Sequence, residues 1–501
     1  MDGRSHVEPL HLDLISPYED FGHLPSSPGI DPNDLLAKLR NGFELPPEED
    51  KRIQAELNWF LKHPDYLDRV FTRAQRYLPY ITAELERREL PLELALLPIV
   101  ESAYDPFAYS HGRAAGLWQM IPGTASRFKI KQNWWYDGRR DIVDSTRGAL
   151  DYLEYLRDFN NGNWLNAIAS YNSGEGNVRR AVRRNTKAGK PTEFWYLRLP
   201  RETSTYVPRL LALVEIVREP AKYGVSLPYV EDIEQFVVAD IDSQLDLALA
   251  AELAGVDVDT IYAYNPGYNR WSTDPKGPHN LVLPVDVAER FAASLEQVPQ
   301  SERVRWKRHK VVSGETISEI AENYHTTIAA VRAANNLRGN TIRAGHHLMI
   351  PVATKPLTAY SQSADARLAK TQNRKRKGHK VTHTVAAGES FWTISRRYGV
   401  THRSLAKWNG MAPGDTLSVG RKLVVWTSAA ETPRVSPTAA HGSTTRKVNY
   451  TVRNGDSLYI IARKFRVGID QIARWNGLDK NKILRPGTRL TMYVDVTRQS
   501  S

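Results

Sequence analysis

The chain has 501 residues, of which 41% are hydrophobic and 25% are charged. This composition is typical of globular domains and excludes wholesale disorder, and the length predicts about three domains or more. Cysteine is absent, which excludes disulfides, thiolate metal sites and cysteine nucleophiles. No apolar run approaches the length of a transmembrane helix, and the amino terminus has neither the basic nor the apolar region of a signal peptide.

Charge is distributed unevenly along the chain. Residues 301–501 hold 35 Lys and Arg against 12 Asp and Glu, a balance of +23, whereas residues 1–300 hold 33 against 44. Such a basic part indicates an anionic partner, which could be nucleic acid, lipid headgroups or an acidic wall polymer. No recognised nucleic-acid motif accompanies the charge, so we expect no nucleic-acid partner.

The amino-terminal part divides into two segments. Residues 1–45 are rich in Pro, Gly and Asp without sustained periodicity, which predicts an irregular leader. Helical periodicity dominates residues 46–228, and no convincing strand pattern interrupts it, so this segment is predicted to be an all-α domain. Within it, the apolar run of residues 91–100 is predicted to form a buried helix that leads directly into Glu101.

The carboxyl-terminal part contains a repeat with the pattern strand, helix, helix, strand. In each copy a Gly-acidic-Ser/Thr turn precedes the first helix, where a hydroxyl and a carboxylate both suit exposed N–H groups. The three copies span residues 307–352, 381–426 and 448–494. Each copy has an asparagine in strict register, which is Asn335, Asn409 or Asn476.

Three further segments surround the copies. Residues 353–380 and 427–447 have little apolar content and are predicted to be linkers. Residues 229–300 loosely repeat the spacing of the copies and end in a similar apolar strand. However, Asp242-Ser243-Gln244 replaces the Gly-acidic-hydroxyl turn there. We expect this segment to be a degenerate copy that acts as a structural spacer.

The repeat resembles the LysM module, a βααβ fold that binds polymers containing N-acetylglucosamine. The resemblance implies a carbohydrate-binding groove between the turn after the first strand and the end of the second helix. A generic βααβ repeat without a ligand is the alternative.

Glu101 is the acidic residue of the helical part with the most unusual predicted surroundings. A carboxylate at the end of a buried helix is costly to desolvate, and burial raises its pKa. A carboxylic acid that stays protonated near neutral pH is what cleavage of a glycosidic bond requires. Taken alone, Glu101 could also be a structural cap or an ion-pair partner.

Four short motifs occur in order along the helical part. They are Glu101-Ser102, residues 116–122, residues 169–174 and residues 202–208, with Ser110 between the first two. Their order and residue types resemble the catalytic domain of the family 1 lytic transglycosylases, which has a goose-type lysozyme-like fold. The predicted fold class is therefore multidomain, with an all-α lysozyme-like catalytic domain followed by small βααβ LysM modules.

The resemblance implies a role for particular residues. Glu101 would be the only catalytic acid/base. The residues implied in substrate binding are Ser110, Gln119, Tyr171, Asn172, Glu202 and Tyr206. Glu202 and Tyr206 are four residues apart and share one face if their segment is helical. Each also has a structural alternative: Ser110 and Gln119 as surface polar groups, Asn172 as a helix cap, and Glu202 as a buried partner.

Two reaction types remain open from the residues alone. A lysozyme-type hydrolase needs a second carboxylate at about 5–5.5 Å or about 6.5–9.5 Å, and the candidates by sequence are Asp105, Asp141 and Glu175. The resemblance instead implies a non-hydrolytic route in which Glu101 protonates the bond between N-acetylmuramic acid and N-acetylglucosamine. The C6 hydroxyl then closes a 1,6-anhydro ring. A non-catalytic wall-binding scaffold is a further alternative.

The resemblance also implies partners and a location. It predicts peptidoglycan glycan strands as substrate, N-acetylglucosamine polymers as ligands of the modules, no cofactor, no metal and a monomeric chain. His379 and His383 are four residues apart but have no acidic ligand nearby in the sequence, which disfavours metal binding. Because the substrate lies outside the inner membrane, we expect the periplasmic side of the cell envelope. Association with the outer membrane is an option, although the chain has neither a signal peptide nor a lipidated cysteine.

Overall fold

A computed structural model gives the fold of most of the chain. The residues that it describes are 14–15, 33–110, 112–428, 445–452, 456–465, 467, 469–478 and 487–495. The chain divides into two compact units, Met1–Ala430 and Glu431–Ser501, and each is described here by itself. Among the described residues, no helix is both long enough and apolar enough to cross a membrane.

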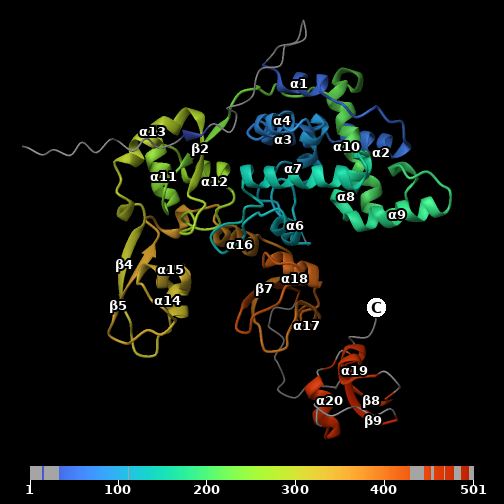
Figure 1. The fold of residues 1–501 in the computed structure, drawn as a ribbon. Helices are drawn as coiled ribbons and strands as arrows, with labels where there is room; N and C mark the ends of the chain where they lie inside the picture. Colours follow the sequence, from blue (N-terminus) through green and yellow to red (C-terminus); the bar gives the residue numbers. More distant parts are fainter. Residues whose placement is uncertain are drawn as a thin grey trace, which may run out of the picture. The chain divides into compact units, whose positions relative to one another are not determined.

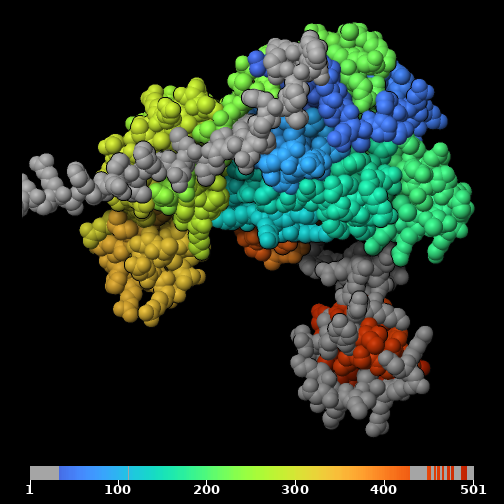
Figure 2. All heavy atoms as spheres, turned by 45° about the horizontal axis from the view of Figure 1, so that its top comes forward, coloured from blue at the N-terminus to red at the C-terminus, as the bar shows by residue number. Residues whose placement is uncertain are grey.

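The first unit begins with a helical domain, whose side chains form one continuous body in the space-filling view (Figures 1 and 2). Its α-helices are α1 (Leu35–Asn41), α2 (Lys51–Leu61), α3 (Pro64–Ala74), α4 (Leu78–Arg87), α5 (Leu97–Ser102), α6 (Pro122–Arg127), α7 (Ile142–Phe159), α8 (Trp164–Ser173), α9 (Glu175–Lys187) and α10 (Arg201–Arg218). Its 3-10 helices are η1 (Leu92–Leu96), η2 (Phe194–Tyr196) and η3 (Pro220–Tyr223).

Helix α10 lies at the centre of this domain. It packs against α2, α8, η1 and α5, and Val207, Leu210 and Leu213 on it are completely buried. The apolar run predicted to be a buried helix forms η1 and α5 in succession, and every residue from Leu92 to Ile99 is buried. This packing fixes the end of α5, where Glu101 is located, against the middle of the domain.

The prediction of an irregular leader at residues 1–45 is wrong for its last part. Helix α1 lies within it, and the Asp34 side chain caps this helix by accepting from the Leu36 N–H at 3.0 Å. Leu35, Leu36 and Leu39 are buried in the core, so the helix is held by packing that a seven-residue pattern does not reveal. Strand β1 (Leu14–Ile15) also lies in the leader, whose residues 1–13 and 16–32 fall outside the described part of the chain.

Residues 236–296 form a LysM-like domain in the order strand, helix, helix, strand, helix. Its elements are β2 (Phe236–Asp240), α11 (Leu247–Ala254), α12 (Val258–Tyr264), β3 (Asn280–Pro284) and α13 (Val285–Glu296). Strand β2 pairs antiparallel with β3, and β1 adds to the other edge of β2. The segment therefore has the order strand, helix, helix, strand that the three modules also have.

Each of the three modules is an antiparallel strand pair covered by two helices. The first consists of β4 (Arg305–Lys310), α14 (Ile317–Asn323), α15 (Ile328–Ala334) and β5 (His347–Val352). The second consists of β6 (His379–Thr384), α17 (Phe391–Arg397), α18 (His402–Trp408) and β7 (Lys422–Thr427). The third, in the second unit, consists of β8 (Thr445–Thr451), α19 (Leu458–Phe465), α20 (Ile469–Asn476) and β9 (Arg489–Asp495).

The asparagine in strict register has the same structural role in every copy. The Asn409 amide donates to the carbonyl oxygens of Leu405 and Val424 at 2.8 Å, and its own oxygen accepts from the Val424 N–H at 2.7 Å. Asn335 and Asn476 make the same three bonds to their own helix and strand. We call this arrangement the amide clip. It satisfies a free carbonyl at the end of the second helix and ties that helix to the second strand.

The LysM-like domain contains the same amide clip. Asn265 donates to the carbonyls of Ile261 and Val282 at 2.9 and 2.7 Å, and it accepts from the Val282 N–H at 2.8 Å. The turn between its first strand and first helix differs from the turn of the modules, but the bond that holds the helix to the strand is kept.

The prediction of a linker at residues 353–380 is wrong for most of its length. This segment contains η5 (Leu357–Ala359) and α16 (Ala364–Asn373), and we call residues 353–373 the strap. Tyr360 is completely buried in the core of the LysM-like domain, and its hydroxyl donates to the Asp246 carboxylate at 2.9 Å. The Thr354 N–H also donates to Asp246 at 2.9 Å. Of the second predicted linker, residues 429–444 lie outside the described part of the chain.

Replacing Tyr360 with alanine should release the strap. The substitution removes a buried ring and leaves the Asp246 carboxylate without its hydroxyl donor, a combined loss of roughly 3–5 kcal/mol. We expect trypsin to cut the variant rapidly at Lys355 and Lys370, which lie on either side of the anchor. In a matched control, Tyr196→Ala removes a tyrosine that is 62% exposed and should leave the cleavage rate unchanged. Equal rates in all three proteins would contradict the anchoring role of Tyr360.

Candidate active site

Helix α5 presents Glu101 at its carboxyl end. The Ser102 hydroxyl lies within 2.9 Å of the Leu117 carbonyl oxygen, to which it donates, and thereby ties α5 to the segment that follows it. The next two residues, Ala103 and Tyr104, both have left-handed backbone angles, with φ of 52° and 54°. This conformation is unfavourable for residues with a Cβ atom, and it turns the chain sharply away immediately after Glu101. The buried Tyr104 hydroxyl donates to the Ala95 carbonyl at 2.6 Å, and this bond stabilises the turn.

A cleft with a volume of about 530 Å³ opens beside the end of α5. All seven residues that the sequence indicates as site residues line it. They are Glu101, Ser110, Gln119, Tyr171, Asn172, Glu202 and Tyr206. They come from α5, from the segment between α5 and α6, and from α8 and α10, so residues more than one hundred positions apart in the chain meet in one place.

The carboxyl group of Glu101 lies in surroundings that favour its protonated form. Burial raises the pKa of Glu101 to about 7, because the charged form loses its hydration. The Tyr206 hydroxyl donates a hydrogen bond to Glu101 Oε1 and opposes this rise, whereas the negative charge of Glu202 adds to it. A carboxyl group with such a pKa can give up a proton and take one back near neutral pH.

Helix α10 contributes both Glu202 and Tyr206, which are one helical turn apart and both line the cleft. Burial raises the pKa of Tyr206 well above its ordinary value, and the nearby Glu101 raises it further. The Tyr206 hydroxyl therefore stays protonated and remains a donor to Glu101.

Helix α8 contributes Tyr171 and Asn172, whose polar atoms are held by neighbouring groups. The buried Thr203 hydroxyl donates to Asn172 Oδ1 at 2.8 Å, so the NH₂ end of this amide remains to donate to a ligand. The Tyr171 hydroxyl donates to the Trp118 carbonyl at 2.7 Å, so its oxygen remains to accept. The cleft thus offers a fixed donor beside a fixed acceptor.

The segment from residue 108 to residue 120, here called the cleft loop, contributes Ser110 and Gln119. The Gln119 amide donates to the carbonyls of Ala108 and Gly116 at 3.3 and 2.9 Å, which leaves its oxygen as the group that can accept from a ligand. Ser110 Oγ accepts from the N–H groups of Gly112 and Ala114, which leaves its own proton to donate.

Gly116 is required by close packing in the cleft loop. It has φ of +83°, and a Cβ atom there would lie 1.7 Å from the carbonyl oxygen of Arg139. Only glycine fits a position that combines this backbone angle with this approach. The first glycine of the second motif therefore shapes the cleft loop rather than contacting a ligand.

Four polar residues of the cleft were not among the predicted site residues, namely Thr124, Tyr152, Ser173 and Glu175. Tyr152 of α7 lines it, as does Glu175 at the start of α9, and the Tyr152 hydroxyl donates to Glu175 at 3.3 Å. Glu175 also pairs with Arg127 at 3.3 Å. Sequence reasoning considered Glu175 only as a second catalytic carboxylate. Its position directly after the third motif is the signal that could have placed it in the cleft.

The other two carboxylates considered for a second catalytic role have structural roles instead. Asp105 accepts from the Phe107 N–H at 2.9 Å within a turn. Asp141 caps α7 by accepting from the Asp144 N–H at 2.8 Å. Neither lines the cleft.

Three known domain families match parts of the chain. The Transglycosylase SLT domain matches residues 79–194, which contain α5, the cleft loop and α8. The LysM-like domain of lytic transglycosylase MltD matches residues 235–300, and the LysM domain matches residues 309–351, 383–426 and 450–492. Membrane-bound lytic murein transglycosylase D of Escherichia coli (strain K12) is 33% identical over 404 residues, which cover 77% of this chain and 85% of that protein.

The chain belongs to the family of membrane-bound lytic murein transglycosylase D. It is thus a lytic transglycosylase, with a lysozyme-like catalytic domain and LysM repeats.

Other relatives share only parts of this transglycosylase. The N-acetylmuramoyl-L-alanine amidase sle1 of Staphylococcus aureus (strain bovine RF122 / ET3-1) is 29% identical over 38% of this chain and 54% of that protein. Among solved structures, an inactive mutant of lytic transglycosylase Slt from Pseudomonas aeruginosa is 24% identical. The match covers 30% of this chain and 25% of that chain, with a TM-score of 0.23.

The two neighbours of Glu101 should shift its titration in opposite directions. If cleavage needs protonated Glu101, activity falls as the pH rises through about 7. Removing the charge of Glu202 in Glu202→Gln lowers the pKa of Glu101 and moves this fall to lower pH. Removing the hydroxyl donor in Tyr206→Phe raises the pKa and moves the fall to higher pH, each by roughly 0.5–1 unit.

The measurement is the pH dependence of kcat/KM on soluble murein glycan strands. Glu193→Gln, which removes an exposed carboxylate outside the cleft, is the control and should leave the profile in place. Shifts of Glu202→Gln and Tyr206→Phe in the same direction would show that a group other than Glu101 governs the fall.

Proposed function

We propose that this lytic transglycosylase cleaves the bond between N-acetylmuramic acid and N-acetylglucosamine in peptidoglycan and leaves a 1,6-anhydro-muramoyl end. The observation that carries the proposal is the position of Glu101. Its partly buried carboxyl group lines the cleft with a pKa of about 7, and a tyrosine hydroxyl is its hydrogen-bond partner.

In the first step, protonated Glu101 donates its proton to the oxygen of the scissile bond. The bond between this oxygen and C1 of the muramoyl ring breaks, and its electron pair stays on the leaving oxygen. The acetamido group of the same sugar stabilises the positive charge at C1, a form of substrate assistance that replaces a second carboxylate. The Tyr206 hydroxyl stabilises the Glu101 carboxylate that results.

In the second step, the Glu101 carboxylate takes the proton of the muramoyl C6 hydroxyl. The C6 oxygen then forms a bond to C1, which closes the anhydro ring and restores protonated Glu101. No water is consumed, and the summed atoms of the two products equal those of the substrate. One carboxyl group therefore acts first as acid and then as base, for which a pKa close to the working pH is best suited.

The remaining groups of the cleft suit an uncharged sugar. Asn172 and Ser110 have protons to donate, whereas Gln119 and Tyr171 have oxygen atoms that can accept. Sugar hydroxyl and acetamido groups need both kinds of partner. We propose that these four residues, with Glu202 and Tyr206, bind and orient the glycan strand.

A hydrolase that uses a second carboxylate is the rival reaction. Glu175 and Glu202 both line the cleft with Glu101, so each is a candidate for such a carboxylate. Glu175 is already paired with Arg127 and accepts from Tyr152. Those contacts favour a structural role at the edge of the cleft.

The substitution Glu101→Gln tests whether the protein is an enzyme that depends on Glu101 or a wall-binding scaffold without activity. Because an amide neither donates the required proton nor takes one back, we expect cleavage of sacculi to fall by roughly 10²–10⁴-fold. Glu175→Gln should keep most of the activity, and mass spectrometry of its products should show anhydro ends. Reducing ends, together with loss of activity in Glu175→Gln, would establish hydrolysis instead.

Folding of the Glu101→Gln variant can be checked through its stability. Burial raises the pKa of Glu101 from its ordinary value of 4.5 to about 7, so this group's contribution to the free energy of unfolding falls as the pH rises between these two values. The neutral variant should therefore melt at a higher temperature than the parent at pH 8, where that contribution is lost, and at nearly the same temperature at pH 4. A lower melting temperature at both pH values would attribute the loss of activity to misfolding.

We further propose that the LysM modules bind the glycan and hold the enzyme on its polymer. Their turn residues are ordered in the first two modules, where Glu315 and Glu389 each pair with a histidine of the preceding strand at 3.1 and 2.7 Å. Trp392, at the start of α17 in the second module, is 54% exposed beside the buried Phe391. An exposed indole ring is a suitable face for a sugar ring to pack against.

Module binding should depend on sugar contacts more than on charge. Salt at 1 M reduces the screening length to about 3 Å, so attraction by the basic C-terminal part is lost while contacts to sugar faces persist. We expect the full chain to stay bound to uncharged chitin at 1 M salt. A variant that ends at Ala430 lacks one of three modules and should bind several-fold more weakly, because avidity falls. Release of the full chain from chitin by salt alone would contradict sugar binding by the modules and would leave them only a role as spacers.

The expected location follows from this substrate. We propose that the enzyme works as a monomer on the periplasmic side of the cell envelope, where peptidoglycan is found. The name of the Escherichia coli relative describes that protein as membrane-bound, which supports association with the outer membrane as an option.

A further inference from the structure

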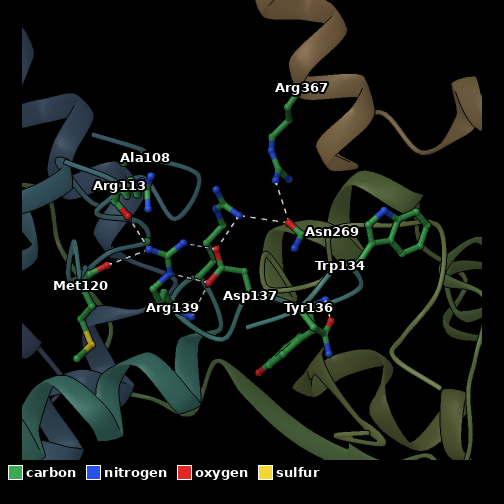
Figure 3. A network of polar contacts seen from close by, with 12 residues as sticks. Ala108, Arg113, Met120, Trp134, Tyr136, Asp137, Arg139, Asn269 and Arg367 are labelled. Atoms are coloured by element: carbon green, nitrogen blue, oxygen red, sulfur yellow. Dashed lines mark hydrogen bonds and ion pairs between the residues drawn. The ribbon is translucent and has the colours of Figure 1, made fainter. Parts of the chain in front are cut away.

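A buried arginine supports the cleft loop from outside the cleft. Arg139 is only 6% exposed, and its Nη1 donates to the main-chain carbonyls of Arg113 and Met120 at 2.5 and 3.3 Å (Figure 3). These two residues lie on the two arms of the cleft loop, between Ser110 and the start of α6. One guanidinium group thus fixes the distance between the arm that presents Ser110 and the arm that presents Gln119.

The position of Arg139 is set in turn by Asp137. Arg139 Nε and Nη2 donate to the two carboxylate oxygens of Asp137, both at 2.8 Å, which is the two-pronged geometry that a guanidinium group favours. Asp137 is 6% exposed. Hydrogen bonds from Arg139 and the charge of Arg140 overcome the effect of burial and hold the pKa of Asp137 below its usual range. The Asp137 carboxyl group therefore stays ionised and keeps both hydrogen bonds from Arg139.

The LysM-like domain completes this network. Arg140 Nη1 donates both to Asp137 at 3.2 Å and to Asn269 Oδ1 at 3.2 Å. Asn269 lies between α12 and β3 of the LysM-like domain. Main-chain bonds join the same two segments, from the Asp137 N–H to the Gly267 carbonyl at 2.8 Å and from the Asn269 N–H to the Trp135 carbonyl at 2.7 Å.

The strap approaches the same point from its other side. Arg367 of α16 lies 3.5 Å from Asn269 Oδ1, to which its Nη2 donates (Figure 3). Its guanidinium group also lies over the ring of Phe107 at 4.7 Å. Asn269 Oδ1 is therefore placed between two guanidinium groups. Burial and the charge of Arg140 lower the pKa of Arg367 to about 9. The amide oxygen is thus the group that separates two like charges.

We propose that Arg139 is a positioning residue for the cleft loop and that Asn269 of the LysM-like domain holds it in place through Arg140 and Asp137. The LysM-like domain then positions residues of the active site and is more than a spacer. This inference rests on the proposed function of the cleft.

Substitutions of Asn269 test the contribution of the LysM-like domain. Asn269→Ala removes the oxygen between the two guanidinium groups but keeps the main-chain bonds, so Arg140 is pushed away and Asp137 loses a donor. Asn269→Asp replaces the amide by a carboxylate that accepts from both arginines, and it should preserve the network. We expect KM for soluble glycan strands to rise roughly three- to tenfold in Asn269→Ala, the cost of about one hydrogen bond, and to stay near the parent value in Asn269→Asp.

Measuring KM and kcat separately distinguishes positioning from a loss of stability. A variant that is merely less stable has fewer folded molecules, so its apparent kcat falls while KM stays constant. Misplaced Ser110 and Gln119 bind the glycan more weakly, so KM rises. The control Glu289→Gln changes an exposed residue on α13 of the same domain and should alter neither value.

Arg139→Lys tests the centre of the network directly. A single ammonium group cannot reach both Asp137 oxygens and the two loop carbonyls together, so we expect KM to rise at least as much as in Asn269→Ala. An unchanged KM in both Arg139→Lys and Asn269→Ala would overturn the inference. Activity retained in Glu101→Gln would instead overturn the proposed function, so the two failures are distinguishable.

Discussion

The helical domain is shaped by one constraint. It must shield the Glu101 carboxyl group from water and still leave this group accessible to a polymer. The fully buried segment of η1 and α5 takes away hydration from one side. The left-handed Ala103 and Tyr104 then turn the chain aside at once, so the carboxyl end of α5 is not covered by its own continuation. Helix α10 supplies the hydroxyl of Tyr206. The cleft lies on the side of the carboxyl group that these elements leave open.

The residues that line the cleft could be predicted from the sequence, whereas the residues that hold the cleft loop in place could not. Glu101 follows an apolar run, and Glu202 and Tyr206 are four residues apart, but it was the resemblance of four ordered motifs to a known family that selected all three. The support is different in kind, because Asp137, Arg139 and Asn269 come from two domains and resemble ordinary surface residues in the sequence. Their burial depends on contacts between distant segments, for which local periodicity has no signal.

Average composition gave a wrong prediction for segments whose structure depends on one or a few buried residues. The strap has few large apolar residues, yet one tyrosine, Tyr360, reaches the core of the LysM-like domain and binds the buried Asp246 carboxylate. Helix α1 was missed for a related reason, since Leu35 and Leu36 are buried by tertiary packing rather than by a long amphipathic pattern. A few buried residues in a short segment outweigh the polar residues around them.

The amide clip has a consequence for how the chain ages. An asparagine followed by glycine loses its amide readily when the next main-chain nitrogen is free to attack it, and Asn409-Gly410 and Asn476-Gly477 are such pairs. In the folded modules the amide is held by three hydrogen bonds, so this reaction is confined to unfolded molecules. The product, aspartate, has no protons to donate to the two carbonyls. A module that deamidates while unfolded therefore cannot form the amide clip again when it refolds. Asn265 in the LysM-like domain precedes Pro266, whose nitrogen carries no hydrogen, so the copy that contacts the helical domain through Asn269 escapes this damage.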